Sequence, residues 1–429
     1  MLGAAAITAG FINTVTPTSV AAGQAEPDPT DSSAAWLRLV VAVVISTIGG
    51  VGMWSVVVAL PTVQAEFGVD RAAASMPYTM TMLGFAAGGV LMGRLADRFG
   101  ITVPIIVSTL CLGAGYIAVG HATSIWQVAI AHGLLIGSGC SATFAPLMAD
   151  ISHWFTRRRG IAVAIAASGN YLAGTIWPPV VQHFITSDGW RATYIGIGLF
   201  CLVTMLPLSL ALRRRIGVQH AAAASAEAAR RQAALPLSPN ALQILLFIAG
   251  LACCVAMSMP QVHIVAYCGD LGYGVARGAD MLSLMLGFGI ISRVASGFIA
   301  DRIGGVRTLL LGSVLQGVAL LLYVMFDGLF SLYVISALFG LFQGGIVPSY
   351  AIIVREYFPA SEASTRVGLV IMATVLGMAL GGWMSGAIFD LTGSYQAAFL
   401  NGLGWNLLNV SIATFLMLRS RGLGTFARA

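Results

Sequence analysis

The stretch GIISRVASGFIADRIGG occupies residues 289–305 and determines how the rest of the chain is interpreted. The apolar run around Arg293 contains no acidic residue until Asp301, so this arginine has no neighbour in the run to balance its charge. The run ends in ADRIG at 300–304, which repeats ADRFG at 96–100, 204 residues earlier. A long apolar run that ends in a duplicated motif predicts a membrane protein built from two related halves.

The composition supports this interpretation. Of the 429 residues, 58 % are hydrophobic and 9 % are charged, and the mean hydropathy is +0.89. These values predict an all-α integral membrane protein, because the apolar runs have helix-spanning length and lack the ten-residue alternation of a membrane barrel. All 22 basic residues are arginine, which excludes lysine-dependent chemistry. The six cysteines lie in or beside apolar spans, where neither a disulfide nor a metal site is expected.

The apolar runs predict twelve transmembrane helices in two pseudo-symmetric six-helix bundles. The predicted spans are 35–63, 73–95, 101–120, 124–151, 158–184, 191–212, 241–267, 278–301, 306–326, 330–356, 365–389 and 395–418. The predicted domains are a disordered cytoplasmic tail at 1–34, an N-terminal bundle at 35–212, a cytoplasmic linker at 213–240, a C-terminal bundle at 241–420 and a cytoplasmic tail at 421–429.

The arginines between the spans predict the orientation. Seventeen of them lie in loops or tails on the side of the two termini, whereas only Arg71, Arg191 and Arg277 lie on the other side. Basic loops stay in the cytoplasm, so both termini are predicted to be cytoplasmic, in the inner (plasma) membrane of the cell. The sequence pI near 9.2 is therefore an orientation signal, and no nucleic-acid partner is expected.

Six plus six spans, with GRLADRFG at 93–100 between the second and third, resemble the major facilitator superfamily over about residues 35–420. Within it, residues 154–194, residues 260–272 and the span of Arg293 resemble the monocarboxylate and oxalate–formate porter branch. The resemblance implies a secondary transporter that moves a small organic anion, a monocarboxylate with a proton, by alternating access.

Two departures from that branch matter. The oxalate–formate type has a lysine in its eleventh span, and this chain has none. Animal monocarboxylate carriers have an acid four residues before the arginine, where this chain has Gly289. The departures argue against a dicarboxylate substrate and against the proton relay of the animal carriers.

The duplicated motif supplies the candidate gating residues. Gly93 would allow a close approach of a neighbouring helix, and Asp97 would accept hydrogen bonds from a helix N-terminus or an arginine. The resemblance implies a latch that keeps the cytoplasmic side closed in the outward-open state. The candidates for it are Gly93, Asp97, Arg98, Asp150, Arg158, Asp301 and Arg302. The alternative is an ordinary loop whose charges only set the orientation.

Arg293 is the main candidate for substrate binding. It lies on a narrow small-and-polar stripe of its helix, formed by Gly289, Ser292, Arg293, Ser296, Gly297 and Ala300. An arginine near the membrane centre is costly and tends to face a water-filled cavity, where its planar fork can hold a carboxylate. The alternative is a structural arginine that bonds backbone carbonyls.

Aromatic and polar residues of other spans complete the candidate site. His263 and Tyr267 are four residues apart on one helix face, and a histidine there can carry a proton or simply pack against a carbonyl. In the first half, the candidates for lining the cavity are Trp54, Tyr78, Tyr116, Asn170 and Tyr171. Tryptophan and tyrosine are also common at membrane interfaces, so each of these residues has a structural alternative.

The absence of an acid in the middle of any span argues against a proton-driven exporter of cationic drugs. Nucleotide-binding and nucleophile motifs are also absent, so the prediction is not an enzyme, and it needs no cofactor. The predicted partners are a small organic anion, a proton and the lipid bilayer, with the chain working as a monomer. The alternatives are a transporter of a larger organic compound with a structural Arg293, or a non-transporting membrane receptor or membrane-embedded enzyme.

Overall fold

The computed structural model describes residues 31–155, 158–214, 237–358 and 360–421. Throughout these ranges the regular structure is helical, as the sequence predicts. The first half contains α1 Ser33–Gly49, α2 Val51–Phe67, α3 Arg71–Phe99, α4 Thr102–Gly120, α5 Ile125–Ala131, the π-helix η1 His132–Gly137, α6 Ser138–Ser141, α7 Ala145–Trp154, α8 Arg159–Asp188 and α9 Trp190–Leu210. The second half contains α11 Pro239–Asp270, α12 Val275–Ile303, α13 Gly305–Met325, α14 Leu329–Gln343, α15 Ile346–Tyr357, α16 Ala360–Thr392 and α17 Tyr395–Arg421.

These helices form twelve consecutive segments in the described part of the chain, because three segments consist of more than one helix. The pair α1 and α2 makes the first segment, the run from α5 to α7 makes the fourth, and α14 with α15 makes the tenth. Ten of the segments are long and apolar enough to cross a membrane by length and composition, and α8 and α17 complete the set. The twelve predicted spans are thus present, with ends that shift by a few residues.

The boundary of the predicted N-terminal tail needs a correction. The Ser32 hydroxyl accepts the backbone N–H of Ala35 at 3.3 Å, which caps α1, so the helix begins at Ser33 rather than after residue 34. The backbone N–H of Asp31 also donates to the carbonyl of Trp154 at 3.0 Å. The rest of the predicted tail, most of the linker and residues 422–429 lie outside the described residues.

The backbone repeats the duplication seen in the sequence. Gly100 and Gly304 follow α3 and α12 with φ angles of 78° and 84°, a region that favours glycine. Gly189 and Gly393 end α8 and α16 in the same region, at 80° and 66°. Each pair is 204 residues apart, so equivalent helices of the two halves end in the same way.

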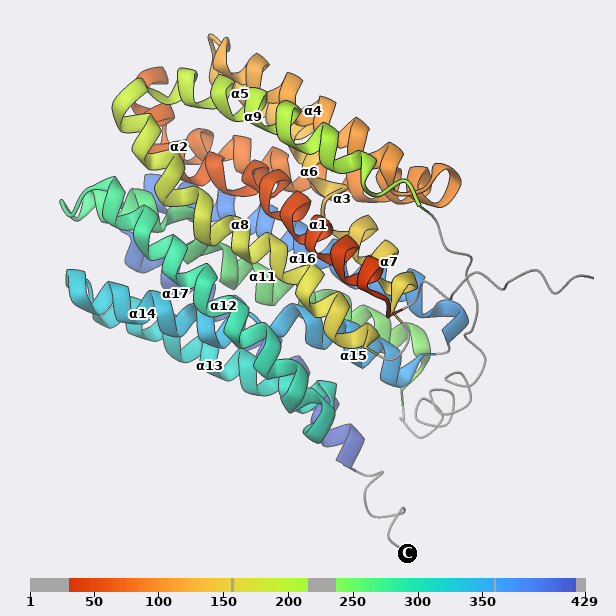
Figure 1. Ribbon diagram of the computed structural model, residues 1–429. Coiled ribbons are helices and arrows are strands. Elements are labelled where there is room, and N and C mark those ends of the chain that lie inside the picture. The colour runs from red at the N-terminus through yellow and green to blue at the C-terminus, as the bar shows by residue number, and fades with distance from the viewer. Residues whose placement is uncertain (1–30, 156–157, 215–236, 359, 422–429) are drawn as a thin grey trace, which may run out of the picture.

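The two halves lie side by side, the first above the second in the view of Figure 1. Their contact runs along two pairs of helices, α3 against α16 and α8 against α12. The first turn of α1 and the last turn of α17 lie at the same end of the molecule (Figure 1). We call this the Asp97 end, because α3 and α12 reach it with Asp97 and Asp301, and we call the opposite end, where α3 begins and α16 finishes, the Arg71 end.

Candidate functional site

Arg293 lies in the middle of α12, at the seam between the two halves. Its Nη1 donates to the backbone carbonyl of Ala167 in α8 at 3.0 Å, and its Nε donates to the carbonyl of Gly344 after α14 at 3.5 Å. The residue is 9 % exposed, and within the described ranges no carboxylate forms an ion pair with it. The predicted membrane-buried arginine therefore lies between the bundles, where it bonds carbonyl groups of both.

The ring of Tyr171 covers one face of the Arg293 guanidinium. The Cζ atom of Arg293 lies 4.1 Å from the ring centroid, a cation–π arrangement. Gly289 makes room for this ring, because a Cβ at that position would overlap Tyr171. Next to Tyr171, the carbonyl of Asn170 accepts the indole N–H of Trp54 at 3.3 Å. The fold thus brings four predicted site residues together at the seam.

The other two aromatic candidates of the first half lie elsewhere. Tyr78 is 1 % exposed and packs on Gly382 of α16, so it lies on the α3–α16 seam. Tyr116 is a correction: it is 0 % exposed, it lies in the core of the N-terminal bundle, and its hydroxyl bonds that of Ser55 at 2.7 Å. Because Ser55 satisfies the phenol, this tyrosine is stable inside the bundle and lines no path between the halves.

His263 and Tyr267 lie near the Arg71 end, in a cluster with Tyr395 of α17. The His263 ring contacts the Tyr395 hydroxyl through Nδ1 at 3.1 Å and the Gly382 carbonyl through Nε2 at 2.8 Å. A carbonyl only accepts, so Nε2 carries the proton and Nδ1 accepts from the tyrosine when the imidazole is neutral. The ring centroids of Tyr267 and Tyr395 are 5.3 Å apart.

The same cluster contains a residue that the sequence analysis assigned only to a loop. Arg71, the first residue of α3, is 7 % exposed. Its Nη1 donates to the Tyr395 hydroxyl at 2.8 Å, and its Nη2 lies 3.2 Å from Oδ1 of Asp270. The backbone N–H groups of Arg71 and Ala72 donate to the Asp390 carboxylate at 2.9 and 2.7 Å. We call Arg71, Asp270, Asp390, Tyr395 and His263 the Arg71 cluster.

At the opposite end, the candidate latch is not engaged in this structure. Asp97, Arg98, Asp301 and Arg302 are exposed. Within the described residues Asp97 makes no hydrogen bond or ion pair. In the part of the chain that the structure describes, nothing from another segment lies within 4 Å of the position where a Cβ of Gly93 would be. The close approach expected at Gly93 is therefore absent from this conformation, and the latch stays a prediction for another one.

Asp150 has a different partner from the one expected. It forms a two-pronged ion pair with Arg38 of α1, at 2.8 and 2.9 Å, instead of facing Asp97 or the arginines that follow α7. Arg38 is 5 % exposed and also donates to the carbonyl of Leu212 at 3.0 Å. The pair joins α1, α7 and the end of α9 within one bundle. Arg158 is exposed, and the neighbouring residues 156 and 157 lie outside the described ranges.

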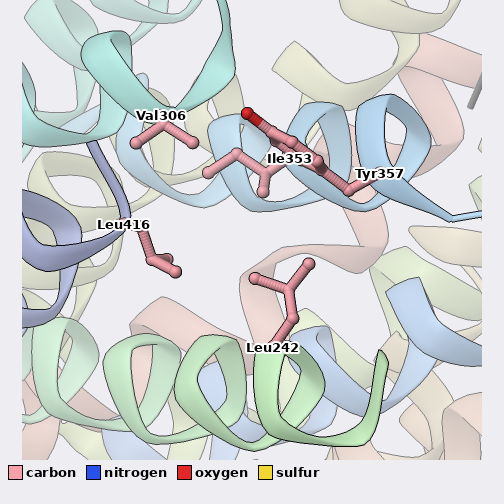
Figure 2. Close-up of a pocket in the computed structure, with 5 residues that line it drawn as sticks. All are labelled: Leu242, Val306, Ile353, Tyr357 and Leu416. Carbon is pink, nitrogen blue, oxygen red and sulfur yellow. The ribbon is translucent and has the colours of Figure 1, made fainter. Parts of the chain in front are cut away.

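Two concave regions accompany these residues. Figure 2 shows an apolar crevice inside the C-terminal bundle, lined by Leu242, Val306, Ile353, Tyr357 and Leu416, whose side chains leave no room for a water molecule between them. A cavity of about 330 Å³ follows the α8–α12 seam beside Thr175, Asp280 and Ser283. Its lining stops at Ile291, so it adjoins the Arg293 group on the Arg71 side without including it.

Comparisons with known proteins match this architecture. The family model of the Major Facilitator Superfamily matches residues 42–329 and 278–427. The chain belongs to the major facilitator superfamily. It is a membrane transporter and not an enzyme.

The relatives define the neighbourhood within that superfamily. The chain is 29 % identical to monocarboxylate transporter 13 of Bos taurus over 322 residues, 73 % of each chain. It is 24 % identical to the MFS-type transporter pynF of Aspergillus niger over 331 residues, which cover 77 % of this chain and 75 % of that one. Among solved structures, a bacterial homologue of the human lysosomal transporter Spinster shares the fold, with a TM-score of 0.67 at 15 % identity, over 91 % of this chain and 98 % of the other. The resemblance to the monocarboxylate branch is thereby confirmed.

Proposed function

We propose that this transporter moves a small organic anion, a monocarboxylate, together with a proton, by alternating access of one central site. The observation that carries the proposal is the position of Arg293 at the seam, with no acidic partner in the described ranges. A guanidinium has five N–H donors, and the two carbonyl bonds use two of them. The remaining donors match a carboxylate, which accepts two parallel hydrogen bonds from one guanidinium.

The surroundings of Arg293 favour a small substrate. Tyr171 covers one face of the guanidinium, so an anion has to approach along the edge, in the plane of the N–H groups. The neighbouring Gly289 position is filled by the same ring. Support for the substrate class also comes from the relatives whose names include monocarboxylate transporters.

Carboxylate binding to purified protein tests the role of Arg293. Arg293→Ala should lose affinity by well over tenfold, because truncating one side of a desolvated charge pair costs about 2–5 kcal/mol. Arg293→Lys keeps the charge without the planar fork and should bind weakly at best. Arg307→Ala is the matched control, since Arg307 is an exposed arginine on the next helix. A folded Arg293→Ala protein that binds carboxylates like the wild type would refute the proposal.

A transporter of a larger organic compound is the second candidate. The observation in its favour is that Arg293 already bonds carbonyls of both halves, as a purely structural arginine would. A transport panel with and without carboxylates in proteoliposomes separates the two candidates. Under the second, Arg293→Ala reduces thermal stability, and its transport of uncharged compounds and of carboxylates falls in parallel.

The proton is assigned to His263 as part of the same proposal. Its Nδ1 faces the Tyr395 hydroxyl, so it can accept a proton when Tyr395 turns its hydrogen away. His263→Gln retains a donor and an acceptor but does not titrate near neutral pH. Carboxylate uptake by this variant should lose its dependence on a pH gradient while exchange of carboxylate across the membrane continues. Unchanged acidification of the vesicle lumen during uptake would remove His263 from the proton path.

We further propose that the Asp97 end is cytoplasmic, on the seventeen-to-three distribution of arginines. A cysteine at Ser225, which lies outside the described residues in the loop between the halves, should be unreactive to an impermeant maleimide added to intact cells. Labelling from outside would reverse the orientation.

A further inference from the structure

The Arg71 cluster joins the two halves of the transporter at the Arg71 end. Arg71 and Ala72 belong to the N-terminal half, whereas their partners Asp270, Asp390 and Tyr395 all belong to the C-terminal half. The Cζ atom of Arg71 also lies 4.9 Å from the centroid of the Phe389 ring. A single residue thus contacts the ends of three helices of the other half, α11, α16 and α17.

The position of Asp390 shows that this contact is specific. It lies in the last turn of α16, where a negative charge is unfavourable for its own helix. Its carboxylate instead accepts two backbone N–H groups from the first turn of α3, where a negative charge is favourable. Asp390 therefore stabilises the N-terminus of a helix in the other half, and its electrostatic benefit disappears if the halves separate there.

The backbones of α3 and α16 are also close at this end. A Cβ on Gly386 would lie 2.9 Å from the carbonyl oxygen of Arg71, and one on Gly382 would lie 2.9 Å from the Tyr78 ring. Thr79 donates to the carbonyl of Ala379 at 3.1 Å. Ala379, Gly382 and Gly386 recur at three- and four-residue spacing, so they form one small-residue stripe that α3 covers.

The other end of the same helices is separated. Among the described residues, no atom of another segment lies within 4 Å of the Cβ position of Gly93 in α3, Gly297 in α12 or Gly368 in α16. The ion pair between Arg71 and Asp270 joins the two halves at the Arg71 end. Helices α3 and α16 are thus in tight contact at the Arg71 end, whereas these three glycines meet no described neighbour toward the Asp97 end.

We infer that the Arg71 cluster is the gate that closes the Arg71 end of the transport path, with Arg71 as the residue that locks it. Alternating access requires this end to open, so Arg71 has to release Asp270, Asp390 and Tyr395 once in every cycle. Tyr395 links the lock to the interior, because its hydroxyl bridges Arg71 and His263. Arg71 is a positioning residue in this scheme, since it acts on the halves and not on the substrate. The inference rests on the transporter cycling between two states and not on the identity of its substrate.

The distance between the halves at the Arg71 end tests the gate directly. Spin labels on Ser187→Cys in α8 and Gln396→Cys in α17 use two exposed positions, one in each half. With the six native cysteines replaced and the protein in lipid nanodiscs, double electron–electron resonance gives the populations of short and long distances. Arg71→Gln should raise the ratio of long to short by about tenfold, because it removes the charged donor of the buried Tyr395 hydroxyl and the ion pair with the exposed Asp270.

Arg191→Gln is the matched control, because Arg191 is an arginine at the same end whose ion pair lies within one half. It should leave the distances unchanged. Tyr395→Phe keeps the ring contacts and removes only the hydroxyl, so it should raise the ratio of long to short distances by a smaller factor. If Arg71→Gln does not fold, Tyr395→Phe replaces it in the test. Unchanged distances in Arg71→Gln would contradict the proposed gate, and if that variant does not fold, unchanged distances in Tyr395→Phe would do so. An equally large shift in Arg191→Gln would also contradict it. Carboxylate binding at Arg293 is measured separately, so the two proposals can fail independently.

Discussion

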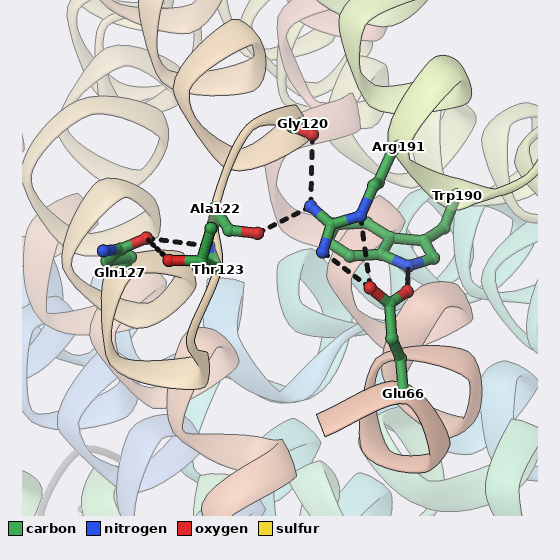
Figure 3. Close-up of polar contacts among 7 residues, drawn as sticks. All are labelled: Glu66, Gly120, Ala122, Thr123, Gln127, Trp190 and Arg191. Carbon is green, nitrogen blue, oxygen red and sulfur yellow. Dashed lines mark hydrogen bonds and ion pairs between the residues drawn. The ribbon is translucent and has the colours of Figure 1, made fainter. Parts of the chain in front are cut away.

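One pair of equivalent positions in the two halves carries different residues, and these residues make different contacts. Glu66 lies in the last turn of α2 and Arg191 in the first turn of α9, and the equivalent positions 204 residues later are Asp270 and Tyr395. In the first half the Glu66 carboxylate lies 2.6 Å from Nη2 of Arg191, and it also accepts the indole N–H of Trp190 (Figure 3). In the second half the equivalent of Arg191 is a tyrosine without a charge, and the cation beside Asp270 is Arg71 from the other half.

The consequence of this difference is a division of roles. Arg191 also donates to the carbonyls of Gly120 and Ala122 at 3.2 and 2.6 Å, so its bonds tie α2, α4 and α9 into one bundle (Figure 3). Because those helices belong to one half, we expect these bonds to persist through a transport cycle. Asp270 instead pairs with Arg71 of the other half, so this ion pair breaks when the halves separate at this end. Glu66 thus stabilises the N-terminal bundle, whereas its equivalent Asp270 stabilises the state in which the Arg71 end is closed.

Reversing the charge of Asp390 should have the largest effect on this comparison. An arginine there would face the N-terminus of α3, which favours a negative charge, and would lose both hydrogen bonds from the α3 backbone. The Arg71 end should fail to close, and transport in proteoliposomes should fall by more than about tenfold. Asp327→Arg makes the same change at an exposed position of the same end and should transport normally. A rate within twofold of the wild type for Asp390→Arg would contradict the assigned role.

Tyr395→Arg gives the C-terminal half its own cation beside Asp270, and it should have an intermediate effect on the distances between the halves. Tyr395→Arg copies the arrangement of Glu66 and Arg191, so Asp270 would pair within its own half and release Arg71. The bonds from the α3 backbone to Asp390 remain, which limits the shift toward long distances between the spin-labelled halves to about threefold to tenfold. Tyr395→Phe separates the loss of the hydroxyl from the gain of the charge. If both variants give the same distances, the copied ion pair has no influence on the gate.

Much of the fold was predictable from the sequence because its signals are local. The twelve apolar segments, the duplication and the position of Arg293 on a small-residue stripe all follow from residues close together in the chain. The partners of Arg71 are 199 and 319 residues away, and Arg38 is 112 residues from Asp150. No spacing rule reaches so far, so the sequence alone indicates only an orientation charge at Arg71 and places Arg38 within the predicted span 35–63. The relevant signal was present, since Asp270 and Asp390 end their spans on the side where arginines are scarce.

The aromatic candidates show a second limit of the sequence. Trp54 and Tyr171 reach the seam, but Tyr116 is inside a bundle, although all three occur in similar apolar spans. Their helices carry apolar residues on every side, because both the bundle core and the lipid are apolar, so the pattern does not show which face meets the other half. A hydrogen-bond partner such as Ser55 for Tyr116 becomes visible only after the helices are packed.

Asp97→Asn probes the end where this structure has no contact between the halves. Because Asp97 has no partner in the described residues here, the change should act only on the state in which the Asp97 end is closed. An exposed charge contact is worth about 0.2–1 kcal/mol, so turnover should slow by no more than about fivefold. Substrate affinity should be unchanged, since Arg293 lies deep in the seam. Glu362→Gln, at another exposed acid of the described C-terminal half, controls for the charge, and wild-type turnover by Asp97→Asn would exclude the latch.

Arg191→Gln should have the smallest effect on transport and a measurable one on stability. The Arg191 and Glu66 side chains are 35 % and 41 % exposed, so their ion pair contributes about 0–1 kcal/mol. The two carbonyl bonds contribute about 1 kcal/mol each, and a glutamine can replace one of them. We therefore expect the stability to fall by about 1–2 kcal/mol, measured as a lower thermal unfolding midpoint, with transport and the distances between the halves unchanged below that temperature. Arg71→Gln should show the opposite pattern, because its bonds exist in only one state of the cycle. Suppose instead that Arg191→Gln keeps the wild-type unfolding midpoint but lengthens the distances at the Arg71 end. Glu66 and Asp270 would then both contribute to the gate, and the two halves would differ only in which arginine pairs with the acid.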